Sequence, residues 1–175
     1  PFSSIFRPKR ILFIALLVVC AMELSSLGLA TTFYVATSGN DSYDGLAPAY
    51  ASGSNGPFRT LQRAAYAVKP GDTVQIRGGI YQAYSSWTAD GTESGPITIT
   101  NYSGEVVAID GNKNTLPAKQ DDVLLQIYGD WYKVSNLEVR YSGGSGVAVH
   151  GAHCTVDNIT SHHNWGSGIY MTGWY

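Results

Sequence analysis

The chain has 175 residues and a formal net charge of -2, with 44% hydrophobic but only 14% charged residues. This length corresponds to one domain. Because Lys and Glu are good formers of surface helices, their scarcity disfavours a helical bundle or a coiled coil. The slightly negative charge also disfavours a dedicated nucleic-acid-binding protein.

The first thirty residues have the layout of a secretory signal. Three basic residues precede an apolar run over residues 11–22, and the small residues Gly28 and Ala30 occupy the two positions that a signal peptidase reads. A membrane anchor is the alternative, but the run is shorter than the roughly 20 residues that span a bilayer. We therefore expect residues 1–30 to be a signal peptide of a secreted, extracellular protein that has no membrane contact after cleavage.

Removal of that segment changes both the charge and the cysteine content. Three bases and one acid are lost, so the net charge becomes -4, and an anionic ligand would need a local basic groove or a bound cation. Cys154 is then the single cysteine and has no partner for an intramolecular disulfide. Its irregular spacing from His150 and His153 favours a structural cysteine over a nucleophile or a metal ligand.

Residues 31–72 are expected to form a strand, a loop and a capping helix. The loop over residues 39–45 is rich in turn formers and contains Asp41 and Asp44. Two carboxylates this close together are able to bind Ca²⁺, whereas carboxylates that flank a glycine turn commonly serve as turn formers. Both interpretations remain open, and Asp41 and Asp44 are our candidate metal ligands.

A helix is predicted between Pro57 and the terminating residues 69–72. Its apolar positions recur at the spacing of one helical stripe. Such a helix at the start of a repeating β-structure would cover the open edge and the exposed core of the first repeat. The stripe consists of Phe58, Leu61, Ala65 and Val68.

Short strand-like runs follow the predicted helix at a similar spacing. Each run is alternating or β-branched and is closed by Gly, Asn or Asp, which is the pattern of a strand followed by a turn. We interpret the runs as successive turns of one repeat. They cover residues 73–76, 96–99, 123–127, 146–149 and 168–171.

The last two repeats are the clearest. Residues 132–151 align with residues 154–173 without a gap, at an offset of 22, and Asn136 meets Asn158. A β-sandwich seldom keeps polar residues in such a register. A parallel β-helix does, because equivalent residues of successive coils stack about 4.8 Å apart and asparagines form a ladder at a bend. We predict an all-β, parallel β-helix over residues 73–175, with the N-terminal helix as its cap.

Alternation along the strands separates core positions from surface positions. The inward set is Val134, Leu137, Val139, Val147 and Val149, and the outward set includes Glu138, Arg140, Ala148 and His150. The offset then stacks Arg140 with His162, Ala148 with Tyr170 and His150 with Thr172, beside the loops 141–145 and 163–167.

This surface is our candidate sugar-binding groove. Tyr170 and Trp165 are suited to stacking on sugar rings, and Arg140 and His162 to contacting carboxylates, with His150 beside them. The alternative is an ordinary solvated face. The pair His162 and His163 is not expected to chelate one ion, because adjacent side chains of a strand point to opposite faces.

The chain resembles the N-terminal part of calcium-dependent pectate lyases with a lysine base, which are secreted right-handed parallel β-helix proteins of the pectin lyase-like superfamily. Alginate lyases and chondroitinase B-like enzymes share part of the pattern. The resemblance covers nearly all of residues 33–173 and is specific for the fold but weak for the chemistry. Its motifs are residues 34–41 (YVATSGND), 44–45 (DG), 56–64 (GPFRTLQRA), 69–77 (KPGDTVQIR), 79–81 (GIY) and 95–99 (GPITI).

The resemblance implies β-elimination on a uronate polymer. In such lyases a Ca²⁺ ion held by clustered aspartates binds the uronate carboxylate, and a Lys or Arg abstracts the C5 proton. Here no Asp or Glu follows Asp157 and no Lys follows Lys133. We interpret the chain, which begins at Pro1 without a methionine, as a fragment that ends before its own calcium ligands and base. The catalytic residues therefore stay unassigned.

We predict the N-terminal part of a secreted, monomeric lyase that acts on an acidic polysaccharide such as pectate. A glycoside hydrolase is one alternative, but it needs two carboxylates about 5 to 9.5 Å apart, and the register does not place Glu138 and Asp157 in one column. A non-catalytic glycan-binding β-helix is the other.

Overall fold

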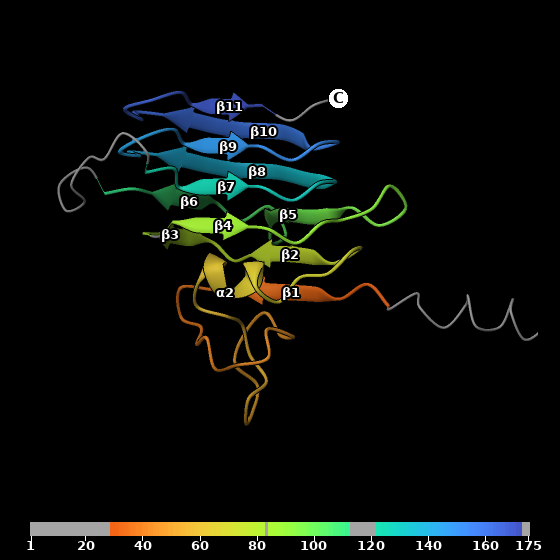
Figure 1. Ribbon diagram of the computed structural model, residues 1–175. Coiled ribbons are helices and arrows are strands. Elements are labelled where there is room, and N and C mark those ends of the chain that lie inside the picture. Colours follow the sequence, from red (N-terminus) through yellow and green to blue (C-terminus); the bar gives the residue numbers. More distant parts are fainter. Residues whose placement is uncertain (1–28, 83, 113–121, 173–175) are drawn as a thin grey trace, which may run out of the picture.

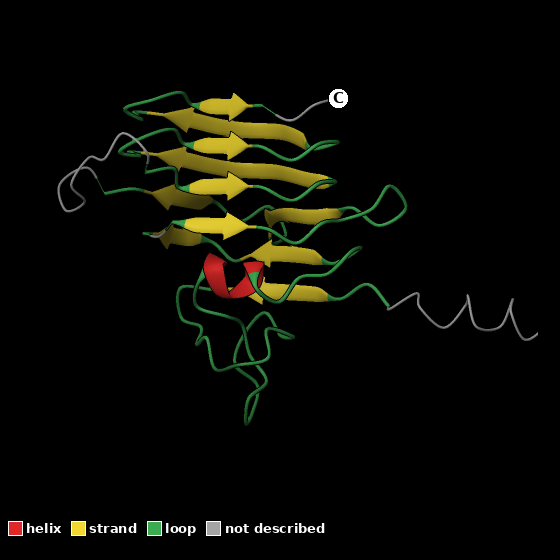
Figure 2. Cartoon of the chain, viewed as in Figure 1, coloured by secondary structure: helices red, strands yellow, loops and turns green. Residues whose placement is uncertain are grey.

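The computed structural model describes residues 29–82, 84–112 and 122–172. Nearly all of the predicted signal peptide lies outside these ranges. Within them the chain winds upward in stacked coils of short strands, with one short helix (Figures 1 and 2). The strands are β1 (Thr32–Val35), β2 (Thr73–Ile76), β3 (Gly79–Tyr81), β4 (Ser85–Trp87), β5 (Ile97–Asn101), β6 (Val107–Asp110), β7 (Leu125–Ile127), β8 (Tyr132–Arg140), β9 (Val147–Val149), β10 (Thr155–His162) and β11 (Ile169–Met171).

The strands form two sheets in which every strand pair is parallel. The larger sheet has the order β1-β2-β5-β8-β6-β3, with β10 beside β8, and the smaller has the order β11-β9-β7-β4. Strand β8 pairs with β5 through its first part and with β6 through its last part. It changes direction between these parts at Asn136, whose φ is 60°. Each full coil therefore has three sides, and the predicted parallel β-helix is confirmed.

The predicted register is also confirmed. Strand β10 lies on β8 with Val156 opposite Val134, and β11 lies on β9 with Ile169 opposite Val147, which are both separations of 22 residues. At the bend, the Asn158 side-chain amide donates a hydrogen bond of 2.7 Å to Oδ1 of Asn136. Both asparagines have a left-handed backbone, a conformation that Asn tolerates better than most residues.

The interpretation of the strand-like runs as one repeat is wrong. Residues 73–76 and 96–99 contribute to β2 and β5 in the larger sheet, whereas the three later runs contribute to β7, β9 and β11 in the smaller one. Each complete coil contributes strands to both sheets. The spacing of the runs alone therefore could not show which runs stack on one another in the same sheet and which follow one another within a coil.

The interior between the sheets is mainly aliphatic, and it also contains the completely buried aromatic side chains of Trp87 and Tyr132. Its side chains are almost completely buried, and each contributes on the order of 1.5–3 kcal/mol by leaving water. Ala148, which we predicted to face outward, is only 2% exposed because Gln126 and Tyr170 lie on either side of it in the paired strands. The buried positions include Val74, Ile76, Ile97, Ile99, Ile109, Leu125, Ile127, Val134, Leu137, Val139, Val147 and Val149.

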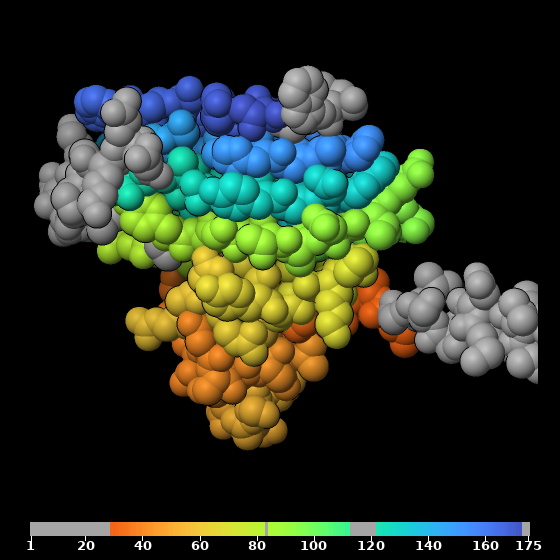
Figure 3. All heavy atoms as spheres, in the orientation of Figure 1, coloured from red at the N-terminus to blue at the C-terminus, as the bar shows by residue number. Residues whose placement is uncertain are grey.

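The first coil is closed by a cap made of the loop after β1 and of helix α2 (Leu61–Ala65). The helix is shorter than predicted. It begins after the N-cap Thr60, whose side chain accepts a hydrogen bond from the backbone of Arg63. Phe58 precedes it and forms a β-bridge with Val35, so all four residues of the predicted stripe are buried although only two are helical. Figure 3 shows the loop as a tapered projection, in orange, below the coils.

Helix α2 also covers the edge of β4. The side-chain amide of Gln62 donates to the backbone oxygen of Ser86 at 3.2 Å, and its oxygen accepts from the Ser86 N–H at 2.9 Å. Gln62 thus satisfies the hydrogen bonds that another strand would otherwise make. Among the described residues, no helix is long and apolar enough to cross a membrane.

Candidate functional site

A charged cluster lies where the larger sheet ends at β8 and β10. Arg140, the last residue of β8, donates from Nε to Oδ2 of Asp110 and from Nη1 to Oε1 of Glu138, both at 2.7 Å. The register explains this, because Asp110 is paired with Arg140 in the sheet. The three side chains are only 12–24% exposed, so they are partly shielded from water.

Two histidines extend the charged cluster. Nε2 of His162 lies 3.0 Å from Oε1 of Glu138, and Nδ1 of His162 lies 2.5 Å from Nδ1 of His163. The expectation that the two histidines face opposite sides is wrong, since β10 ends at His162 and His163 takes a left-handed backbone with a φ of 54°. Hydrogen bonds from His162 and then Arg140 hold the pKa of Glu138 below its ordinary value, against the opposing effect of burial.

An aromatic column lies on the smaller sheet. The ring of Tyr128 stacks on His150 with centroids 4.7 Å apart, and His150 meets Tyr170 edge-on at 6.3 Å. As predicted from the register, His150 also contacts Thr172, with 3.1 Å between Nδ1 and Oγ1. Tyr128 and Tyr170 are 48% and 47% exposed, so their rings are accessible to a ligand.

Tyr128 was not among the predicted site residues. It precedes His150 by 22 residues, so extending the offset one coil toward the N-terminus would have found it. The same extension finds Trp131, which stacks on His153 with centroids 4.0 Å apart.

The five predicted sugar-binding residues do not form one groove. Arg140 and His162 end β8 and β10, whereas His150 directly follows β9, which runs in the opposite direction across the view in Figure 1. Trp165 lies in the loop between β10 and β11 and is 71% exposed. The structure therefore brings Arg140 together with His162, and His150 with Tyr170, on separate sides of a coil.

A hollow of about 600 Å³ lies at the asparagine corner. Its wall includes Asn136 and Asn158 of the ladder, Thr160, and Glu138 of the charged cluster. The turn between β5 and β6 also lines the hollow through Glu105 and its neighbours. Amide, hydroxyl and carboxylate groups of this kind are suited to hydrogen bonds with a hydroxyl-rich ligand.

The structure gives Asp41 and Asp44 contacts within the cap. Oδ1 of Asp41 accepts from the N–H groups of Arg59 and Thr60, and its Oδ2 accepts from the Thr60 hydroxyl. Asp44 accepts from Leu46 and Gly56 backbones and from Asn55, and the Leu46 bond chiefly lowers its pKa.

No group of three or more His, Cys, Asp or Glu suited to a metal ion occurs among the residues that the structure describes. Those residues do not fit the calcium centre that the resemblance implies. Calcium binding by Asp41 and Asp44 stays a prediction.

The carboxylates that a hydrolase would need are not aligned. Glu138 pairs with Thr160, and Asp157 pairs with Ser135, so the two acids lie in different columns of the stacked strands. Glu138 is also engaged by Arg140 and His162.

The comparisons with known proteins indicate the same family. A model of the Pel9A-like right-handed β-helix region matches residues 33–174. Pectate lyase L of Paenibacillus polymyxa is 29% identical over 116 residues, which are 63% of this chain and 25% of that protein. Pectate lyase L of Dickeya dadantii is 27% identical over 160 residues, 86% of this chain and 36% of that protein.

The solved structures agree. The crystal structure of pectate lyase Pel9A aligns with a TM-score of 0.65 and 25% identity, over 83% of this chain and 37% of that one. The chain thus spans between a quarter and somewhat more than a third of the length of these relatives. With the coils, the ladder and the register in agreement, the chain belongs to the Pel9A-like right-handed β-helix family.

Proposed function

We propose that the protein containing this chain is a secreted lyase that cleaves a uronate polymer such as pectate by β-elimination. The observation that supports it most is the family match over residues 33–174, together with two pectate lyase relatives that align over 116 and 160 residues. In this proposal the described coils bind and orient the polymer, and Ca²⁺ with its base acts elsewhere in the protein.

The aromatic column is proposed to contact sugar rings. Tyr128 directly follows β7 and Tyr170 lies in β11, with β9 between these strands of the smaller sheet, so a sugar chain that runs along the helix axis would meet the exposed rings of both residues. Their apolar rings pack against the C–H faces of sugars, and each hydroxyl remains available as a polar handle.

The charged cluster is proposed to set the local potential beside the polymer. Arg140 is paired with both Asp110 and Glu138, one base with two acids, so the three side chains carry a formal charge of -1 and favour a hydroxyl group or a cation over a uronate carboxylate beside them.

The activity is tested with the full-length protein and polygalacturonate, by following the ultraviolet absorbance of the unsaturated product with added Ca²⁺ and with a chelator. We expect product with Ca²⁺ and none with the chelator. Absence of unsaturated product on pectate, alginate and other uronate polymers under both conditions rules out the lyase.

The role of the aromatic column is tested by Tyr128→Ala and Tyr170→Ala. Each is expected to raise KM about 3- to 10-fold with kcat unchanged, because a stacking contact of about 0.5–1.5 kcal/mol is lost from substrate and transition state alike. Tyr66→Ala, at an exposed tyrosine next to helix α2, is the matched control and is expected to leave KM unchanged. Equal effects of all three variants would contradict the assignment.

A further inference from the structure

A pocket of about 440 Å³ lies in the cap, between helix α2 and strand β3, away from both the aromatic column and the charged cluster. A volume of this size is within the range of small-molecule sites. Thr37 follows β1, Arg59 and Thr60 precede α2, and Tyr81 and Gln82 lie at the end of β3. Leu61 and Ile80 complete the lining.

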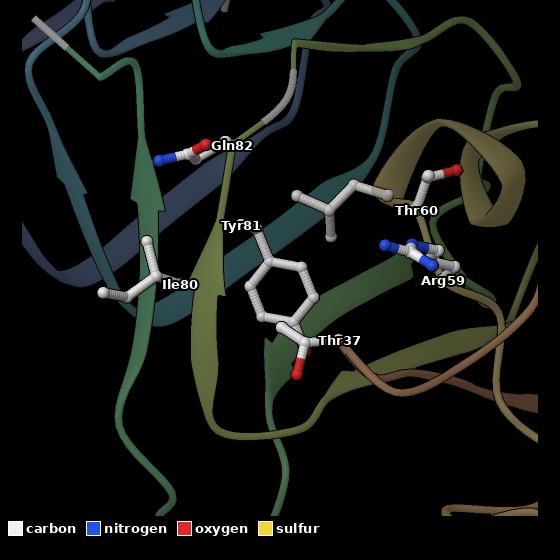
Figure 4. A pocket seen from close by; sticks show the side chains of 7 residues that line it. Thr37, Arg59, Thr60, Ile80, Tyr81 and Gln82 are labelled. Carbon is white, nitrogen blue, oxygen red and sulfur yellow. The ribbon is translucent and has the colours of Figure 1, made fainter. Parts of the chain in front are cut away.

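Three polar side chains of this cap pocket, all on exposed residues, have no protein partner in the part of the chain that the structure describes. Within the described residues, no hydrogen bond or ion pair engages the guanidinium of Arg59, the hydroxyl of Thr37 or the amide of Gln82. Arg77 and Arg140 are instead paired with carboxylates. Figure 4 shows Gln82 and Thr37 at opposite ends of the Tyr81 side chain, with Arg59 beside its ring.

The backbone around Arg59 is fixed although its side chain is free. Asp41 accepts the N–H groups of Arg59 and Thr60, at 2.8 and 2.9 Å, so its carboxylate is directed to the main chain. The hydroxyl of Tyr81 is bonded to the backbone oxygen of Arg77 at 2.7 Å, which fixes the ring that lines the pocket. The fixed backbone and the fixed wall limit the entropy lost on ligand binding to that of ordering the Arg59 side chain itself.

We propose that the cap pocket binds a sugar that carries a carboxylate, at a site separate from the place of cleavage. A guanidinium forms two parallel hydrogen bonds with a carboxylate. Thr37 and Gln82 offer both donors and acceptors for the hydroxyls that flank the carboxylate of a sugar acid. Ile80, which is 55% exposed, provides the apolar surface for the C–H face of the sugar. The inference concerns binding alone and stands whether or not the protein cleaves its polymer.

The test is chemical protection of Arg59 in the full-length protein. Phenylglyoxal modifies accessible guanidinium groups, and peptide mass spectrometry gives the rate at each arginine. We expect galacturonate, at about ten times its dissociation constant, to slow modification of Arg59 about tenfold. Arg140, which is already paired with two carboxylates, is the internal reference and is expected to be slow throughout.

Two further ligands and two variants make the test specific. Galactose and acetate, at the same concentration as galacturonate, are expected to give little protection. Binding measured by calorimetry is expected to lose one class of site in Arg59→Gln and to keep it in Lys69→Gln, which removes an equal charge outside the pocket. Failure of galacturonate to protect Arg59 overturns the proposal, and equal protection by acetate overturns the sugar part of it.

Discussion

The lower coils and the upper coils of the helix are built differently. In the lower part, Thr73 pairs with Thr98 and Ser85 with Leu125, which are separations of 25 and 40 residues. In the upper part, β10 on β8 and β11 on β9 both keep a separation of 22. The paired strands are equally parallel in both parts, so the difference lies in the corners between them.

One corner shows the cause. Between β5 and β6 the turn takes five residues, 102–106, and the side chain of Asn101 bonds the backbone oxygen of Glu105 at 2.8 Å. In the upper coils the same corner is one left-handed asparagine, Asn136 or Asn158. Coil length is therefore set by how many residues a corner needs, and the ladder appears where that number falls to one.

The largest effect is expected where successive backbones approach most closely. A Cβ on Gly151 would lie within van der Waals overlap of the Gly129 backbone, and one on Gly129 would overlap that of Ala89. Ala89 itself is tolerated because β4 is the last strand of its sheet. Gly151→Ala should lower the free energy of unfolding by at least about 3 kcal/mol, measured by urea denaturation.

The control for that prediction is Gly104→Ala. Gly104 has a φ of 76° with open space around its Cβ position, so the substitution costs only left-handed strain of about 1–2 kcal/mol. Equal destabilisation by Gly104→Ala and Gly151→Ala would contradict the view that close backbone contact at Gly151 causes the larger loss of stability.

The second prediction compares the two corners directly. Asn136→Ala should cost about 2 kcal/mol, from left-handed strain and from the lost ladder bond, whereas Asn101→Ala should cost about 1 kcal/mol from one hydrogen bond. Asn136→Gly separates the two contributions, because glycine accepts the left-handed backbone. Recovery of most of the lost stability in Asn136→Gly would show that strain exceeds the ladder bond, measured by thermal unfolding.

The third prediction concerns acid. The hydrogen bond from His162 leads the effects that lower the pKa of Glu138 in the folded state, so folding favours the ionised carboxylate. This contribution is complete above the ordinary pKa of 4.5 and is lost as pH falls through the lower, folded value. As the pH is lowered from about 5 to about 3, the urea concentration at the midpoint of unfolding should decrease. Glu138→Gln should make this decrease smaller.

The smallest effect is expected from Glu105, an acid of the lower coils that is also paired with an arginine. A hydrogen bond from Arg77 lowers the pKa of Glu105 as well, but the two side chains are about one-third exposed. Water screens such a pair. Glu105→Gln should alter the same pH profile less than Glu138→Gln does, and the reverse order would contradict the view that the upper cluster is the better shielded one.

The difference between the coils also explains what the sequence could predict. The gapless offset of 22 was enough to place Asn136 against Asn158 and Arg140 against His162. It did not reveal Asp110 as the partner of Arg140, since that pairing crosses an irregular coil. Nor could alternation foresee the contact of His162 with His163, which depends on a left-handed residue just beyond the strand. Apolar periodicity located the buried cap residues but overestimated the helix.

The contact of Gln62 with the edge of β4 affects how the protein can assemble with other chains. Strand β4 is the last strand of the smaller sheet, and its outer edge is covered at Ser86 by the side-chain amide of Gln62, a group about the size of a peptide unit. An unprotected strand at that position would be a template on which other chains could add indefinitely, as in fibrils. A single amide therefore lets the protein begin a stack of strands without offering its first layer to its neighbours.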